Sequence, residues 1–108
     1  MSVLLKGGNA MNLVIKDFIG SKVASENEQG DLIFDEISTS LDESEAEILL
    51  DFSGLKLITT AFLNNAIGKL YKNYGKEKLN NRLKIKNITD KGDVELLKLV
   101  ILNAMEAA

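Results

Sequence analysis

The residues best suited to chemistry gather in one short segment, between an apolar run at Ile48–Phe52 and the helix expected to follow it. Asp51 could bind a cation or accept hydrogen bonds from the amides that open the helix, but we favour a carboxylate satisfied by the loop backbone. Ser53 belongs to a Ser-Gly turn and is not expected to be a nucleophile, because no base is available to activate it. Thr59 or Thr60 can cap the helix by accepting a hydrogen bond from a free amide, and the remaining amides could hold an anion.

The residue types that are missing exclude most catalytic chemistry. The 108 residues include no Cys, His, Trp or Pro. Without Cys there is no disulfide, thiolate nucleophile or Cys-based zinc site, and without His there is no Ser-His-Asp triad and little basis for a transition-metal site. Any metal would be Mg²⁺ or Ca²⁺ held by carboxylates. The acidic run Asp42, Glu43, Glu45 and Glu47 has no apolar framing and is interpreted as solvated charge. We therefore expect a non-enzymatic protein with no cofactor and no metal.

Three helices are predicted from apolar residues at helical spacing, and each stripe predicts a helix that lies on a sheet. Ser25 and Glu28 have the spacing of a capping box that would open the first helix, with Gly30 either inside that helix or just before its start. Gly75 is expected to end the second helix. The predicted helices run from Ser25 to about Leu41, from Thr59 or Thr60 to about Tyr74, and from about Gly92 to Met105.

The predicted strands alternate with these helices, which indicates parallel βαβ units. The predicted fold class is α/β: a single domain with a mixed, mostly parallel sheet of about four strands, packed by three helices. Leu55, Leu57 and Ile58 form an apolar linker that should pack against something. The predicted strands are Asn12–Ile15, which Phe18 and Ile19 could extend before Gly20 ends it; Ile48–Phe52, buried on both faces; and Arg82–Ile88, a half-exposed edge strand.

Residues 1–10 admit two interpretations. In the first, they are an added leader, because Met11 is a credible native start. In the second, Val3–Lys6 is an extra edge strand that turns back through Gly7-Gly8-Asn9. The domain itself is expected to cover residues 11–108. The apolar patch near the start is too short for a signal peptide, and no apolar run approaches the length of a membrane span.

Charge is segregated along the chain, although the net charge is only -3. Residues 26–51 hold ten acids and no base, whereas residues 52–98 hold ten bases and four acids. The two regions are either ordinary solvated faces or recognition surfaces. The acidic first helix could meet a basic partner, the basic second helix (Lys69, Lys72, Lys76) an acidic one, or the two could meet in a homodimer. Nucleic-acid binding is not expected, because the whole chain is acidic and Tyr71 and Tyr74 are explained by packing.

The segment from Ile48 to Gly68 resembles the STAS superfamily, named for sulfate transporters and anti-sigma factor antagonists. There a buried strand ends in Asp, a short loop carries a Gly, and an Asp-Ser-Ser-Gly-Leu segment opens a helix. The chain is more similar to the STAS-like family of small bacterial domains, in which the strand ends in Asp-Phe and the helix opens with Ile-Thr-Ser/Thr-x-Phe-Leu. Asp51-Phe52, Ile58 to Leu63 and Gly68 fit that pattern over about 21 residues.

The resemblance implies a domain that acts through protein contacts, with the start of the second helix as the surface that meets a partner kinase. In the antagonists the second Ser of the motif is phosphorylated to break that contact. Here Thr59, Thr60, Ala61 and Phe62 replace its Asp-Ser-Ser-Gly, so the usual phosphorylation is impossible. Thr60 could accept phosphate one residue earlier, although we favour Thr59 and Thr60 as residues that only cap and pack.

We therefore expect a cytoplasmic protein-interaction domain of a bacterial regulatory system, similar to an anti-sigma factor antagonist. Its expected partner is a protein, with an ATPase-kinase-like regulator as the candidate. Neither nucleic acid nor a membrane is an expected partner. The alternative is a small-ligand or nucleotide sensor that binds an anion at the Thr59/Thr60 helix start. The candidate partner-binding or regulatory residues are Asp51, Ser53, Thr59, Thr60, Ala61, Phe62, Asn64 and Asn65.

Overall fold

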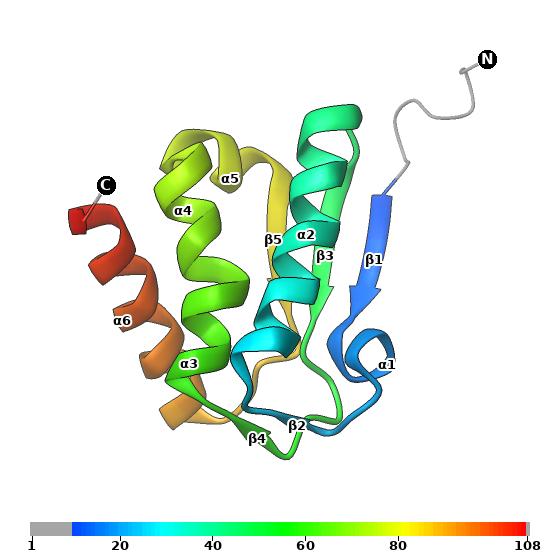
Figure 1. Ribbon diagram of the computed structural model, residues 1–108, viewed down its shortest axis with the longest axis vertical. Coiled ribbons are helices and arrows are strands. Elements are labelled where there is room, and N and C mark those ends of the chain that lie inside the picture. Colours follow the sequence, from blue (N-terminus) through cyan, green and yellow to red (C-terminus); the bar gives the residue numbers. More distant parts are fainter. Residues whose placement is uncertain (1–9, 108) are drawn as a thin grey trace.

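The computed structural model describes residues 10–107, and the two interpretations of residues 1–10 fall almost wholly outside that range. Strands precede helices along most of the chain, and the helical runs at 27–43 and 60–74 lie side by side over one face of the larger sheet (Figure 1). The elements are β1 (Ala10–Val14), α1 (Ile15–Ile19), β2 (Val23–Ala24), α2 (Asn27–Glu43), β3 (Glu47–Asp51), β4 (Leu57–Ile58), α3 (Thr60–Leu63), the π-helical segment η2 (Asn64–Gly68), α4 (Lys69–Tyr74), α5 (Lys76–Arg82), β5 (Leu83–Lys86) and α6 (Lys91–Ala107).

The predicted α/β class is confirmed, but the strands divide between two small parallel sheets. β3 is the central strand of the larger sheet, between β1 and β5, so the prediction that the third strand lies at an edge is confirmed. The register aligns Val14, Asp51 and Lys86 at the carboxyl edge. Ile48 and Leu50 are completely buried, whereas the intervening Leu49 is partly exposed. The prediction that β3 is buried on both faces is therefore wrong for one face.

The second sheet is a two-residue ladder that the sequence did not predict. β2 pairs with β4 in parallel, with Val23 opposite Leu57 and Ala24 opposite Ile58. Each of these short strands leads almost directly into a long helical run, so the ladder sets the starts of two helices side by side at one end of the molecule (Figure 1). The prediction that Phe18 and Ile19 could extend β1 is wrong, because both residues belong to the short helix α1. That helix ends at Gly20, whose φ of 73° lies in the left-handed region that suits glycine.

The first long helix, α2, starts one residue away from its predicted cap. Glu26 is the N-cap, and the side-chain oxygen of Gln29 accepts hydrogen bonds from the amides of Ser25 and Glu26, both at 2.9 Å. The Ser25–Glu28 capping box is thus wrong, since Gln29 takes the role expected of Glu28. The predicted stripe is correct: Ile33, Ile37 and Leu41 are all buried.

The second predicted helix is present over residues 60–74, where α3, η2 and α4 follow one another without a break; we call this run the middle helix. Gly75, with a φ of 86°, ends it as predicted. The short helix α5 after it was missed. Helix α6 packs mainly on the middle helix and not on the sheet, so the prediction that every helix lies on a sheet is wrong for α6 (Figure 1).

Arg82 ties α5 to the end of α2. Its Nε donates to the carbonyl oxygen of Ala46 at 2.8 Å, and its Nη2 donates to the carbonyl oxygen of Ser40 at 3.3 Å. The Ser40 carbonyl oxygen also accepts from the amide of Ser44, so Arg82 adds a further hydrogen bond at the end of α2 and links it to the loop before β3. Within residues 10–107, every helix is too short or too polar to span a membrane.

Candidate functional site

The start of the middle helix is fastened to the start of α2 by Thr59. Its hydroxyl oxygen accepts a hydrogen bond from the amide of Phe62 at 3.2 Å, as an N-cap does, and donates to the carbonyl oxygen of Ser25 at 3.0 Å. The backbone amide of Thr59 also donates to the carbonyl oxygen of Ala24 at 3.1 Å. Thr59 is therefore occupied by structural contacts, and the residues that follow it hold a fixed position.

Three of the residues that sequence analysis singled out reach the surface at this helix start. Thr60, Ala61 and Asn64 are exposed. Phe62, between them, is completely buried in the core, so it cannot itself touch a partner while the domain stays folded. The helix start thus exposes Thr60, Ala61 and Asn64, while the buried side chain of Phe62 anchors it in the core.

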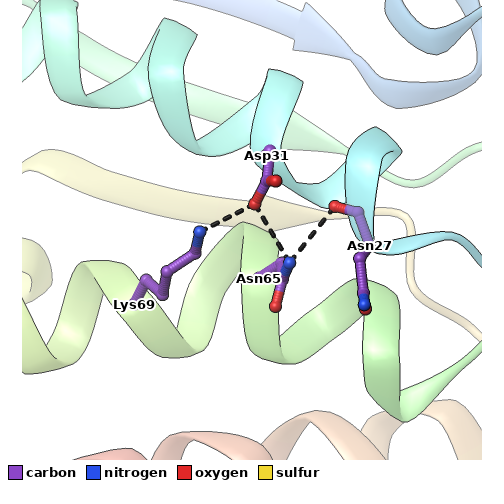
Figure 2. A network of polar contacts seen from close by, with 4 residues as sticks. All are labelled: Asn27, Asp31, Asn65 and Lys69. Atoms are coloured by element: carbon purple, nitrogen blue, oxygen red, sulfur yellow. Dashed lines mark hydrogen bonds and ion pairs between the residues drawn. The ribbon is translucent and has the colours of Figure 1, made fainter.

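Asn65 points toward α2 and joins a polar network between the two helices (Figure 2). Its Nδ2 donates to Asp31 Oδ1 at 3.0 Å and to the carbonyl oxygen of Asn27 at 3.3 Å. Lys69, one turn on, donates to the same Asp31 oxygen at 2.7 Å and lies 5.0 Å from the centre of the Phe34 ring. The hydrogen bond from Lys69 is the main reason that the pKa of Asp31 lies below its ordinary value. Asn65 therefore has a structural role between the helices.

The two helices are in close contact at Gly30. A Cβ atom built there would lie 2.7 Å from both Asn65 Cβ and the carbonyl oxygen of Phe62, closer than real Cβ contacts. Gly30 lies inside α2, so the alternative that placed it inside the helix is correct and the one that placed it before the helix start is wrong. The absence of a side chain lets the middle helix lie directly against α2.

Asp51 is the last residue of β3 and lies beside Lys86, at the end of β5. It is buried, and its Oδ1 accepts hydrogen bonds from Asn87 Nδ2 at 2.8 Å and from the amide of Ser53 at 2.9 Å. These bonds, that from Asn87 foremost, hold the pKa of Asp51 below its ordinary value against the opposing effect of burial. The loop backbone supplies one of the two hydrogen bonds, as we favoured, and the Asn87 side chain supplies the other. Asn87, with a φ of 63°, is the partner that sequence analysis missed.

A small pocket of about 90 Å³ opens beside Asn87 at the carboxyl edge of the sheet, between the loop after β3 and the start of α6. Asp90 and Asp93 both line it, and burial, with a further contribution from Asp90, raises the pKa of Asp93. Within the part of the chain that the structure describes, no three acidic, His or Cys side chains converge closely enough to hold a metal ion.

The β2–β4 ladder adds two apolar residues to the helix start. Val23 is 40% exposed and its partner Leu57 is 50% exposed, although the linker that contains Leu57 was predicted to be packed. Lys22 and Lys56 flank the pair, and the amide of Lys56 donates to the carbonyl oxygen of Lys22 at 2.8 Å. A two-residue strand is too short to show a periodicity. The signal that could have indicated this surface is the group of apolar residues Leu55, Leu57 and Ile58 in a linker.

We define the ladder face as Lys22, Val23, Lys56, Leu57, Thr60 and Ala61, which are exposed and lie at the end of the molecule where β2, β4 and α3 meet (Figure 1). The face combines two apolar side chains, two lysines and a helix start. Such a combination suits a protein surface with apolar and acidic groups. The anion-binding alternative for Thr59 and Thr60 stays a prediction.

Comparison with known proteins identifies the family. A family model described as a STAS-like domain of unknown function matches residues 29–93, more than half of the chain. The matched region begins in α2, ends in the first turn of α6, and contains Asp51, Asn87 and the start of the middle helix. No curated protein and no solved structure shows a significant match.

Proposed function

We propose a function from one premise: the chain belongs to the family of STAS-like domains of unknown function. The chain acts as a non-enzymatic protein-interaction module in the cytoplasm of a bacterium, in a regulatory system similar to that of an anti-sigma factor antagonist. Its partner is a protein, with an ATPase-kinase-like regulator as the first candidate. The binding surface is the ladder face.

The observation that carries this proposal is the exposure of Val23 and Leu57 side by side at the helix start. Burying two such side chains on a partner would gain roughly 25 cal/mol for each Å² of apolar surface removed from water. Both belong to a ladder whose main-chain hydrogen bonds fix their positions, so little side-chain or loop ordering opposes binding. A preorganised apolar pair inside a charged rim is the usual anatomy of a contact surface.

The lysines indicate the kind of partner. Lys22 and Lys56 are exposed beside the apolar pair, and within residues 10–107 neither forms an ion pair. The two helix starts next to them add the positive ends of their dipoles. A partner with acidic groups around an apolar contact is therefore favoured, and its association should slow as salt is added.

The test is a pull-down from the source cell, followed by calorimetry with the purified partner. Leu57→Asp and Ala61→Glu each add a negative charge to the ladder face at an exposed position, and each should abolish capture of the partner. Leu102→Asp changes a leucine of similar exposure, 48%, on α6 and is the matched control. A partner that binds all three variants equally well would disprove this surface.

A separate measurement addresses the ligand-sensing alternative. A melting temperature that rises with millimolar nucleotide, and does so without any protein partner, would favour anion binding at the helix start over the proposed interaction. We expect no such rise.

A further inference from the structure

The outward side of α2 forms an acidic ridge, defined as Glu28, Leu32, Asp35 and Glu36. Leu32 is 50% exposed, and the three acids lie three or four residues from it, which places all four side chains on neighbouring turns of one helix side. An apolar side chain within a ring of carboxylates is the pattern of a helix that binds through its outward side. A complementary surface would bury Leu32 and place cations near the surrounding acids.

The helices next to α2 carry a groove with the matching chemistry. It has a volume of about 280 Å³ and lies between the middle helix and α6. Gly68 and Ala104 are among its smallest lining residues and leave room between the two helices. We define the amide–lysine groove by its other principal residues, which are Asn64, Asn65, Lys69, Lys72 and Asn103.

The acids of the ridge and Lys72 of the groove have no ion-pair partner within the described residues, whereas Lys69 of the groove is already paired with Asp31 of the same chain. Within residues 10–107 the ion pairs are Asp31–Lys69 and Glu95–Lys98, and they include neither Lys72 nor any acid of the ridge. Asp35 and Lys72 are both exposed. Each surface is therefore available to a second molecule.

The position of the two surfaces identifies that molecule. In Figure 1, α2 and the middle helix lie side by side on one side of the sheet, and α6 follows on the far side of the middle helix. The ridge belongs to α2 and the groove lies between the middle helix and α6, so the two surfaces are carried by adjacent helices of one layer. A surface that carries both members of a complementary pair can meet itself around a two-fold axis, with each copy giving its ridge and receiving its partner's.

We propose that the chain forms a two-fold symmetric homodimer in which the acidic ridge of each copy binds the amide–lysine groove of the other. Leu32 packs over Gly68 and Ala104, while Glu28 and Asp35 meet Lys72 and the groove amides. The contact has few apolar side chains, so the dimer is weak and dissociates as salt screens its charges. The proposal is independent of the ladder face, because the two surfaces share no residue.

The first measurement is sedimentation equilibrium of the full chain between about 10 µM and about 1 mM, at low salt and at about 0.5 M NaCl. We expect the mass to rise from the 11.8 kDa of one chain toward twice that value at low salt, and to stay near one chain at high salt. A single chain at every concentration, or assemblies that grow beyond two chains, would overturn the two-fold arrangement.

The second measurement uses charge reversal. Asp35→Lys and Lys72→Glu should each raise the dissociation constant of the dimer about tenfold or more, because like charges then meet at both contacts. A one-to-one mixture of the two variants should dimerise again, since both of its contacts join opposite charges. Lys84→Glu, which changes an exposed lysine of β5, is the matched control and should dimerise like the unmodified chain. Single variants that still dimerise, or a mixture that does not, would overturn the proposal. Leu57→Asp should leave dimerisation unchanged, which separates this result from the test of the ladder face.

Discussion

The hydroxyl of Thr59 donates to the carbonyl oxygen of Ser25, 34 residues earlier in the chain, over 3.0 Å. The same hydroxyl accepts from the Phe62 amide, so one side chain both caps the middle helix and holds the loop that precedes α2. Because the exposed residues Thr60 and Ala61 follow Thr59 directly, the geometry of the ladder face depends on a residue that a partner need not touch.

Replacing Thr59 should therefore lower stability. Thr59→Val keeps the shape but removes both hydrogen bonds, and we expect a loss of about 1–2 kcal/mol in the free energy of unfolding. Thr59→Ser keeps the hydroxyl and should lose much less. Urea denaturation measures both, with Thr60→Val as the control at an exposed position; equal stability of the Val and Ser variants would contradict the role given to the hydroxyl.

Gly30 and Gly68 form a pair of helical glycines with opposite expected responses to alanine. Gly30→Ala puts a Cβ 2.7 Å from the Phe62 carbonyl oxygen and should destabilise the domain by about 1–3 kcal/mol despite alanine's higher helix propensity. At Gly68 the nearest atom, Val100 Cγ1, is 3.5 Å away, so Gly68→Ala should be neutral or stabilising by up to about 1 kcal/mol. Thermal unfolding of the two variants compares them directly; a Gly30→Ala variant as stable as Gly68→Ala would mean that the helices can separate freely.

Asp51 should contribute to the pH dependence of stability. The hydrogen bonds from Asn87 and the Ser53 amide lower its folded-state pKa below the ordinary value of 3.8. A lowered folded-state pKa gives stabilisation that is complete above the unfolded-state pKa and disappears as the pH falls through the folded-state pKa. The difference in unfolding free energy between the unmodified chain and Asp51→Asn should thus be constant from neutral pH to about 5 and shrink below about 4.

Asn87→Gly is the companion variant for this experiment. Glycine keeps the φ of 63° accessible but removes the main hydrogen bond to Asp51, so the acid-dependent loss should be smaller than in the unmodified chain. Denaturation curves at a series of pH values test both variants. A difference that does not change between pH 6 and pH 2 would show that Asp51 titrates alike in the folded and unfolded chain.

Arg82 should matter through its geometry as well as its charge. Arg82→Ala removes the bonds to the carbonyl oxygens of Ser40 and Ala46 and should cost about 1–3 kcal/mol. Arg82→Lys keeps the charge but cannot place two donors on two carbonyl groups in the same way, so it should recover only part of that loss. Urea denaturation compares the unfolding free energies of the two variants. If Arg82→Lys were as stable as the unmodified chain, the positive charge alone would explain the contribution of Arg82.

The elements that could be predicted from the sequence are those with a long apolar period. The stripe of Ile33, Ile37 and Leu41 has enough turns to show its period, and Gly75 marks a helix end by its backbone freedom. Helices α1 and α5 were missed because so few turns carry little periodicity. The capping box was displaced by one residue because Gln29 reaches two amides at once.

The candidate site could be predicted only in part, because its contacts join distant parts of the chain. Sequence analysis found Asp51 and the start of the middle helix, but not Asn87, which is 36 residues from Asp51. It also could not find the exposed pair Val23 and Leu57, since two-residue strands show no periodicity and their partners are 34 residues apart in the chain. Asn65 was expected at the surface, yet its side chain joins α2.

The π-helical segment Asn64–Gly68 has a further consequence for the middle helix. A π turn closes its hydrogen bond over five residues, so the run contains about one residue more than a regular helix of the same length. The extra residue rotates everything after it by roughly 100°. The side chains of Thr60–Leu63 and those of Lys69–Tyr74 therefore do not continue the same stripes along the helix. The side of the helix that faces α2 is made by different sequence positions before and after the π-helical segment. Deleting a single residue here would restore a regular helix and turn Lys69 away from Asp31, so the length of this segment determines which side chains meet as firmly as their chemistry does.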